Sequence, residues 1–319
     1  MKAAVIEEFG RPPVFRDFDE PQRAPGQALV EVTAAPLNPV DIKIASGSYV
    51  AGSPPLPYVA GREAVGRVLE SDTLDAGTRV YVDGGSGGLA ERVVAGDENL
   101  IELPDGVEDA LAGSLGVAGL AAWLALDWRG NLSQGETVLV LGASGAVGMI
   151  AVQAAKLLGA GRVVAAARSE KGLERARQLG ADATVHLDGS GDLAERFVEA
   201  GEGQIQLTVD PLWGEPATAA VRATSFGGRL VHVGKSAAPE ATFDSDSVRG
   251  RMISILGHIT PGVPVEARRE AYGQMLRHAA AGDLTVDYEL LPLARVAEAW
   301  ERQDASPGRK LVLAPGDVR

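Results

Sequence analysis

The sequence contains no cysteine among its 319 residues. Disulfide bonds, thiolate nucleophiles and zinc sites with cysteine ligands are therefore excluded. Long apolar runs are also missing, because no stretch of about 18 residues is apolar and free of charge, as a membrane-spanning helix requires. The first ten residues, MKAAVIEEFG, lack the basic segment and apolar stretch of a signal peptide. We therefore expect a cytoplasmic protein.

Basic residues are scarce relative to acidic ones, with 30 lysines and arginines against 43 aspartates and glutamates and a formal net charge of −13. Nucleic acids and anionic membranes need basic patches, so neither is an expected partner. A phosphorylated small molecule in a local basic pocket is compatible with this charge. Hydrophobic residues make up 45% of the chain, enough for substantial cores, and the length predicts about two domains.

The pattern of apolar residues changes along the chain. The first part has short valine-rich segments separated by clusters of proline, glycine and aspartate, which is typical of β-strands. From residue 137 onward, apolar strands alternate with amphipathic helices, which predicts a parallel sheet covered on both faces. We expect the last strand of the chain to return to the sheet of the first domain.

The segment VLVLGASGAVGMIAVQAAKLLGA, residues 138–160, is the most informative. A strand runs into a turn with a GxxGxxG spacing and then into a helix. Glycine permits a sharp turn, close approach to a pyrophosphate and tight helix packing, and the free N–H groups of a helix start bind phosphate. The alternative is an ordinary strand-to-helix turn. The predicted dinucleotide-binding residues are Gly142, Ala143, Ser144, Gly145, Ala146, Val147 and Gly148.

The end of the next strand indicates which dinucleotide binds. An NAD site usually has an acid there to bind the ribose hydroxyl groups. Here the strand ends in small residues followed by Arg168, Ser169 and Lys171, and Glu170 comes one step after the serine. Arginine and lysine suit a 2′-phosphate, so NADP(H) is favoured over NAD(H). The alternative is that these residues only cap the next helix.

Ligands of a doubly wound sheet bind at the carboxyl ends of its strands. This adds residues after two later strands to the predicted cofactor site. Asp210, at the end of another strand, is expected to begin a turn, and the alternative is that it lines the adenine side of the cofactor site. The added residues are Val233, Gly234, Lys235 and His258.

The chain resembles the medium-chain dehydrogenase/reductase superfamily, and within it the zinc-free quinone oxidoreductase and zeta-crystallin branch. The segments that carry the resemblance are GASGAVGMIAVQAAKLLGA with ARSEKGLERARQLGAD, LNPVDIKIASGSY, GREAVGRV, AGTRVYV and SPGRKLVL. The resemblance implies a GroES-like β domain over residues 1–113 and a Rossmann dinucleotide-binding domain over residues 114–258. Residues 259–319 would complete the first domain, with the active site in a cleft between the domains. It also implies a homodimer, for which MISILGHI is the candidate edge strand, and the alternative is that this segment is a buried central strand.

Zinc-dependent relatives use a cysteine, the histidine of a GHE motif and a further ligand. This chain has Gly61-Arg62-Glu63 at that motif, and its four histidines all lie outside residues 1–113. A catalytic zinc ion needs three converging protein ligands, so we expect no zinc. We expect Glu63 to be a structural residue that bonds to the backbone or to Arg62.

The resemblance places Asn38, Asp41 and Tyr49 at the catalytic site. Asn38 would position the nicotinamide ribose or the substrate oxygen, Tyr49 would offer an O–H donor, and Asp41 would orient a neighbour. The alternatives are a turn cap, packing in a loop and a helix cap, respectively. Two departures count against NADP(H): Leu187 stands where members of the branch often have a tyrosine, and the region near Asp304 lacks the arginine that some members use.

The resemblance implies an NADPH-dependent, zinc-independent reductase that transfers hydride to a quinone or an α,β-unsaturated carbonyl. An enoyl-thioester or carbonyl reductase is the alternative on the same scaffold, because fold does not settle function. A protein that binds NADPH without catalysis is the alternative from another class. The physiological substrate is not identified by the sequence.

Overall fold

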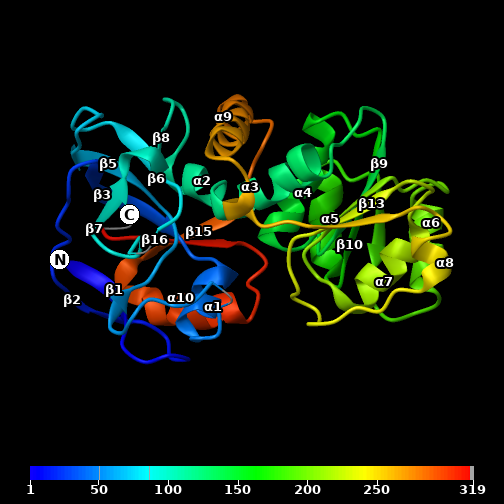
Figure 1. The fold of residues 1–319 in the computed structure, drawn as a ribbon, viewed down its shortest axis with the longest axis horizontal. Helices are drawn as coiled ribbons and strands as arrows, with labels where there is room; N and C mark the ends of the chain where they lie inside the picture. Colours follow the sequence, from blue (N-terminus) through cyan, green and yellow to red (C-terminus); the bar gives the residue numbers. More distant parts are fainter. Residues whose placement is uncertain (50, 86, 317–319) are drawn as a thin grey trace. The chain divides into compact units, whose positions relative to one another are not determined.

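The computed structural model describes residues 1–49, 51–85 and 87–316, and the chain divides into two compact units (Figure 1). The first unit contains Met1–Val117 and Leu276–Arg319, and the second contains Ala118–Met275. Helix α9 (Val265–Ala281) begins in the second unit and ends in the first. Residues 259–275, which the resemblance groups with the C-terminal segment, therefore cluster with the second unit.

The second unit is built on a six-stranded sheet in which every pair of neighbouring strands is parallel. The predicted parallel sheet is confirmed, and its strand order reverses between β9 and β12, as in a doubly wound fold. In spatial order the strands are β11 (Ala183–His186), β10 (Arg162–Ala167), β9 (Thr137–Leu141), β12 (Leu207–Asp210), β13 (Arg229–His232) and β14 (Ser254–Gly257).

Helices cover the two faces of this sheet (Figure 1). Every residue of β9 is buried, because a central parallel strand has helices on both sides, and this explains its continuous apolar run TVLVL. The helical elements of the unit are α3 (Val117–Leu124), the π-helical turn η2 (Ala125–Arg129), α4 (Ala146–Leu157), α5 (Glu170–Gln178), α6 (Leu193–Ala200), α7 (Gly214–Ala223), α8 (Ser245–Val248) and η3 (Thr260–Gly262).

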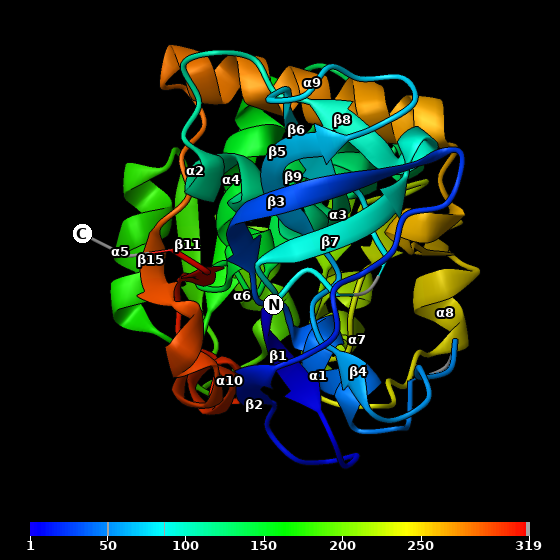
Figure 2. The same ribbon diagram turned by 90° about the vertical axis from the view of Figure 1, so that its left-hand side faces the viewer.

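The first unit is β-rich and contains two sheets (Figure 2). The larger sheet runs in the order β15 (Tyr288–Pro292), β16 (Lys310–Ala314), β3 (Gln27–Pro36), β5 (Ala64–Glu70), β6 (Arg79–Val82) and β8 (Leu100–Glu102), with β7 (Arg92–Gly96) also paired to β3. The smaller sheet contains β2 (Val14–Asp17), β1 (Lys2–Ile6) and β4 (Tyr58–Val59). The helical elements are α1 (Pro39–Ala45), η1 (Asp97–Asn99), α2 (Asp109–Ser114), η4 (Leu293–Arg295) and α10 (Val296–Asp304).

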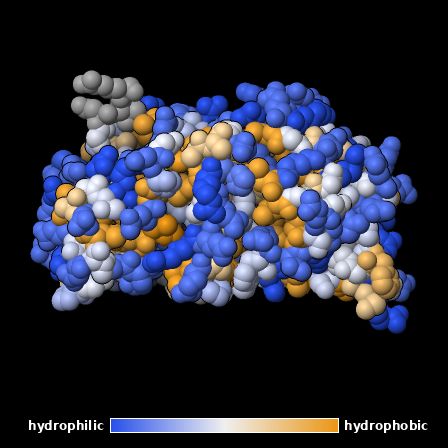
Figure 3. Space-filling model, turned by 90° about the horizontal axis from the view of Figure 1, so that it is seen from above, coloured by the Kyte–Doolittle hydropathy of each residue, from blue (hydrophilic) through white to orange (hydrophobic). Residues whose placement is uncertain are grey.

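Polar side chains cover much of the surface. On the face drawn in Figure 3, apolar residues form separate patches among hydrophilic ones. Among the described helices, none has the length and apolar character needed to cross a membrane.

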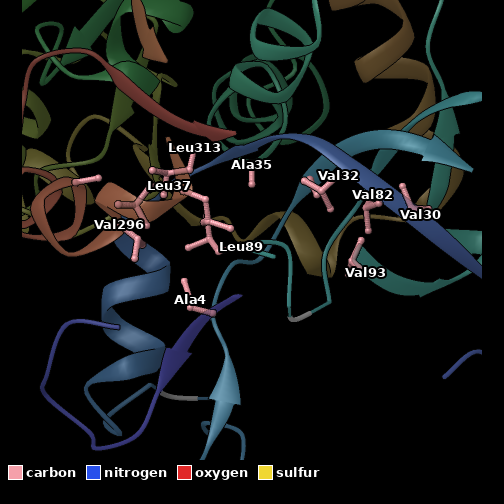
Figure 4. Close-up of a cluster of buried hydrophobic side chains, with 14 of the residues drawn as sticks. Ala4, Val30, Val32, Ala35, Leu37, Val82, Leu89, Val93, Val296 and Leu313 are labelled. Atoms are coloured by element: carbon pink, nitrogen blue, oxygen red, sulfur yellow. The ribbon is translucent and has the colours of Figure 1, made fainter. Parts of the chain in front are cut away.

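The core of the first unit joins the two ends of the chain. Leu313 of β16 and Val296 of α10 are buried in the same cluster as Leu37 and Leu89 (Figure 4). Strand β16 pairs antiparallel with the end of β3, where Leu313 lies opposite Ala35. The predicted return of the last strand to the first sheet is confirmed.

Candidate active site and cofactor site

The glycine turn of the second unit leaves backbone donors free at the start of α4. The first hydrogen bond of the helix runs from Met149 N–H to Gly145 O, at 2.9 Å. The three N–H groups before it, those of Ala146, Val147 and Gly148, therefore have no acceptor within the helix. The N-cap residue Gly145 supplies no side chain to satisfy them. Such a helix start suits an anionic group.

Two glycines in this turn are required by geometry. Gly142 has a φ of +63°, a left-handed conformation that side chains disfavour. A Cβ atom on Gly148 would lie 2.2 Å from the carbonyl oxygen of Gly142. Ser144 is half-buried, whereas Ala143 is buried and donates its N–H to Ala166. The turn thus has the cradle that a pyrophosphate needs, and an NADP(H) or NAD(H) molecule fits these residues.

Cationic side chains follow β10. Arg168 and Lys171 are exposed, and neither has an acidic partner in the described part of the chain. Ser169 caps α5 by accepting the Gly172 N–H at 3.1 Å, so the capping role weighed for this residue is present. The structure leaves the two cationic groups available to a phosphate.

The residues predicted after β13 lie in a turn. The N–H groups of Val233 and Gly234 both point to Asp210 O, at 2.7 and 3.3 Å, while Lys235 is exposed. Asp210 Oδ1 accepts the N–H groups of Leu212 and Trp213 at 2.8 and 2.9 Å. The expectation that Asp210 begins a turn is confirmed.

His258 follows β14 and is buried, with 7% of its surface exposed. Within the described residues, neither ring nitrogen has a hydrogen-bond partner. Burial, together with the nearby charge of Arg129, lowers the pKa of the imidazole to about 4, so the ring is neutral near pH 7. Unsatisfied buried nitrogens fit a polar ligand at this edge of the sheet.

In the first unit, a fully buried carboxylate, that of Glu63, binds Asn38, one of the predicted catalytic residues. Glu63 Oε1 accepts from Asn38 Nδ2 at 2.7 Å, and Oε2 accepts from the Tyr81 hydroxyl at 2.8 Å and the Val117 N–H at 2.6 Å. The predicted structural role of Glu63, with a bond to the backbone, is confirmed. Arg62 is not among its partners in the described part of the chain.

Lys310 completes this network, and sequence reasoning missed it. Its ammonium donates to Asn38 Oδ1 and lies 3.7 Å from Glu63 Oε1, with 3% of its side chain exposed. Burial lowers the pKa of Lys310, and the charges of Glu63 and Asp41 oppose that effect. The available signal was a lysine at the start of an otherwise apolar strand, KLVLA. A charge there needs a buried partner.

Asn38 and Asp41 are held together at the start of α1. Asp41 Oδ2 accepts the Asn38 N–H at 2.7 Å, so the predicted helix-capping role of Asp41 is present. Asn38 is 1% exposed and both polar atoms of its side chain are occupied, by Glu63 and Lys310. A ligand that contacts the Asn38 side chain must therefore share or replace one of these bonds.

Asp41 has an unusual environment for a carboxylate. It is 3% exposed, and its Oδ1 forms no hydrogen bond of normal geometry within the described residues. Burial raises its pKa to about 7 and the charge of Glu63 adds to the rise, while the Asn38 and Arg62 backbone groups and Lys310 oppose it. The group is therefore close to half-protonated near neutral pH.

Asp41 and Tyr49 line the same pocket in the first unit, which has a volume of about 420 Å³. Most of the wall comes from small or apolar residues, so the pocket suits a compact organic ligand. The lining residues are Asp41, Ile44, Tyr49, Ala51, Gly52, Ser53, Pro54, Tyr58, Val59, Ala60, Gly61, Arg62 and Gly85. Asn38 is not among them.

The donors present do not fit a zinc ion. Within the described ranges, no three histidine, aspartate or glutamate side chains gather in a geometry that holds a metal, and cysteine is absent from the sequence. The carboxylate of Glu63 is already occupied by three donors.

The chain matches two protein families, the alcohol dehydrogenase GroES-like domain over residues 24–129 and the zinc-binding dehydrogenase family over residues 146–281. It is 32% identical to human quinone oxidoreductase over 243 residues, which cover 73% of each protein. It is 30% identical to the bovine quinone oxidoreductase-like protein 2 over 261 residues, 80% of this chain and 74% of that protein.

Solved structures of oxidoreductases are also similar to this chain. The quinone oxidoreductase from Thermus thermophilus, described with its NADPH complex, is 30% identical, with a TM-score of 0.83 over 98% of this chain and 100% of that chain. A probable oxidoreductase from Mycobacterium abscessus is 29% identical, with a TM-score of 0.87 over 99% of both chains. The chain belongs to the quinone oxidoreductase family of the medium-chain dehydrogenase/reductase superfamily.

Proposed function

We propose that this protein is an NADPH-dependent, zinc-independent reductase of quinones or α,β-unsaturated carbonyl compounds. The observation that carries the proposal is the glycine turn before α4, followed at the end of β10 by exposed cationic side chains. A pyrophosphate is stabilised by the free N–H groups of the helix start. The 2′-phosphate of NADPH would pair with Arg168 and Lys171. The NADPH complex of the Thermus relative supports the same cofactor.

When bound, NADPH supplies the hydride and its two electrons. The acceptor then gains negative charge on its oxygen, which hydrogen-bond donors stabilise. The Tyr49 hydroxyl is such a donor on the pocket wall. Asp41, in its protonated form, is able to deliver the proton that completes the reduction, because its raised pKa keeps a proton available near neutrality.

In this proposal Asn38 acts as a positioning residue. Its backbone N–H fixes Asp41, and its side chain ties α1 to Glu63 and Lys310. Hydride transfer requires the acceptor to be held close to the cofactor, and a rigid pocket wall helps to hold the acceptor in place. The direct contact with the ribose that the resemblance implies would come in addition.

The same scaffold would serve an enoyl-thioester or carbonyl reductase, or a binding protein without turnover. The discriminating experiment is a fluorescence titration with NADPH and with NADH, followed by addition of 1,4-benzoquinone and a simple enone. The proposal expects NADPH to bind at least about tenfold more tightly than NADH, a margin that one or two charge-assisted contacts supply. Arg168→Ser should reduce that preference, and Arg177→Ser, on the following helix but paired with Glu174, should not. Binding without oxidation would support the non-catalytic alternative, and binding of neither nucleotide would overturn the proposal.

A further inference from the structure

Arg62 is fixed on the wall of the pocket by its neighbours in sequence. Gly61, before it, has a φ of +101°, and a Cβ atom there would lie 2.6 Å from Leu89 N, so the backbone is tightly packed. Glu63, after it, is held by the buried hydrogen bonds of its carboxylate. The backbone is thus held on both sides of Arg62, and the half-buried Arg62 side chain lines the pocket.

The Arg62 guanidinium has no hydrogen bond or ion pair in the described part of the chain. Within the described residues, Arg168 also lacks an acidic partner but is exposed, whereas Arg62 is half-buried. Several other arginines of the first unit are paired with acids, including Arg23 with Asp72, Arg79 with Asp109 and Arg302 with Glu289, each at 2.5 Å. A partly buried guanidinium without an acceptor is unfavourable, and a bound carboxylate would satisfy it with two parallel hydrogen bonds.

The other titratable groups on the pocket wall leave Arg62 as the dominant charge. They are Asp41, Tyr49 and Tyr58. Burial and the nearby charge of Asp41 raise the pKa of Tyr58 to about 12, so this hydroxyl stays neutral. Asp41 faces the pocket, and its raised pKa reduces its repulsion of an anion near neutral pH. The aromatic side chains of Tyr49 and Tyr58 on the wall suit a flat ligand.

We propose that Arg62 makes this pocket selective for an anionic acceptor, a flat quinone or enone that carries a carboxylate or sulfonate beside its reducible group. The inference rests on the proposed reductase function and names its substrate class. The volume of about 420 Å³ leaves space for roughly one substituted ring, at the small end of ligand pockets.

The test compares 3-benzoylacrylate with its ethyl ester, which share the enone and the ring and differ in charge. The sequence has no cysteine that such enones would alkylate. Binding is first measured by calorimetry without cofactor. Wild type should bind the acid about 10- to 100-fold more tightly than the ester, the range that a charged hydrogen-bonded pair supplies. Arg62→Met should remove this preference, and Arg62→Lys should keep part of it.

The matched control is Arg67→Met, which removes the same charge from an exposed site on the neighbouring strand β5 and should leave the acid preference unchanged. Thermal unfolding checks that each variant folds, and Arg62→Lys serves if Arg62→Met does not. Equal affinity of wild type for acid and ester, or an acid preference that survives in both Arg62 variants, would overturn the proposal.

The kinetic arm separates the two proposals. With NADPH present, the acid-to-ester ratio of kcat/KM should fall about 10- to 100-fold in Arg62→Met, mainly through the KM of the acid. Preferential binding of the acid without oxidation of NADPH would keep the anion site and contradict the reductase function. Reduction of both compounds with the same ratio in wild type and Arg62→Met would keep the reductase and contradict the anion site.

Discussion

Asp41 has a structural task at the start of α1, and the proposed reaction gives it a chemical one. One carboxylate oxygen caps α1 by accepting the Asn38 N–H, and the other is buried without a normal hydrogen bond in the described residues. A fully ionised carboxylate in that position loses the hydration that it has in water. The protein therefore tolerates Asp41 best in the protonated form, which is the form that can donate a proton to a reduced acceptor.

This environment predicts a pH-dependent cost in stability. The pKa of Asp41 rises from 3.8 to about 7 on folding, so the folded state holds a proton that the unfolded state has lost. The corresponding stabilisation is fully present below the ordinary pKa and disappears as the pH rises through about 7. Asp41→Asn keeps an acceptor for the Asn38 N–H and has no charge to bury.

As the pH rises from ~5 to ~8, wild type should therefore lose roughly 2 to 3 kcal/mol of its free energy of unfolding relative to Asp41→Asn, which has no such group to ionise. Urea denaturation of both proteins at several pH values measures the difference. A difference that stays constant across this range would show that Asp41 is ionised in the folded protein throughout.

At the scale of elements, the turn before α4 depends on close packing of helix on strand. A Cβ atom on Gly148 would meet Gly142 O at 2.2 Å, whereas one on Gly145 would meet the same atom at 3.5 Å, an ordinary contact. Gly148→Ala should lower stability by about 1–3 kcal/mol, the usual cost of forcing atoms into a packed interior. Gly145→Ala should leave the melting temperature close to that of wild type.

Gly148→Ala should also weaken NADPH binding strongly, because the displaced turn no longer presents its N–H groups to the phosphates. Thermal unfolding of the two variants measures the effect on packing, and NADPH titration measures the effect on phosphate binding. Wild-type stability and affinity in Gly148→Ala would contradict the structure of this turn.

Strand β16 contributes the charge that balances the buried Glu63. Lys310→Met would leave the Glu63 carboxylate buried without a cation, which typically costs about 3–5 kcal/mol. The double variant Glu63→Gln/Lys310→Met removes both charges and should be clearly more stable than Lys310→Met alone. Chemical denaturation of the single and double variants measures the coupling. Additive effects would mean that the two groups do not stabilise each other.

The elements themselves were predictable because their signals are local. The glycine spacing of residues 142–148 and the apolar run of β9 each lie within one short segment. The Asn38–Lys310 hydrogen bond spans 272 positions, and no periodicity reports such a pair. The lack of an acceptor for the Arg62 guanidinium within the described residues was equally hidden, because it depends on which side chains the fold brings near it.

At the scale of the whole molecule, we expect two copies to associate through the edge strand β14. It is the last strand of its sheet and pairs only with β13 within the described chain. Met252 and Ile259, at either end of the strand, are 67% and 71% exposed. An edge strand flanked by exposed apolar side chains is suited to pairing with a second copy, so the homodimer implied by the resemblance is a prediction that this strand supports.

Ile259→Glu should shift a dimer toward monomer, because it would place a carboxylate in an apolar contact. The control Val14→Glu adds the same charge at an exposed apolar site on β2 of the first unit and should leave the assembly unchanged. Sedimentation equilibrium over a range of concentrations measures the association constant. A monomeric wild type, or a dimer insensitive to Ile259→Glu, would contradict an interface at β14.

The most direct test of the central claim follows the hydride itself. NADPH labelled with deuterium on one or the other face of nicotinamide C4 is incubated with the protein and an enone, whose β-carbon retains a transferred deuteride. Mass spectrometry of the product should find deuterium from one of the two labelled forms and none from the other, because a fixed site presents one face. Bound NADPH that stays unoxidised, or a reduced product free of deuterium from both forms, would contradict the account of this protein as an NADPH-dependent reductase.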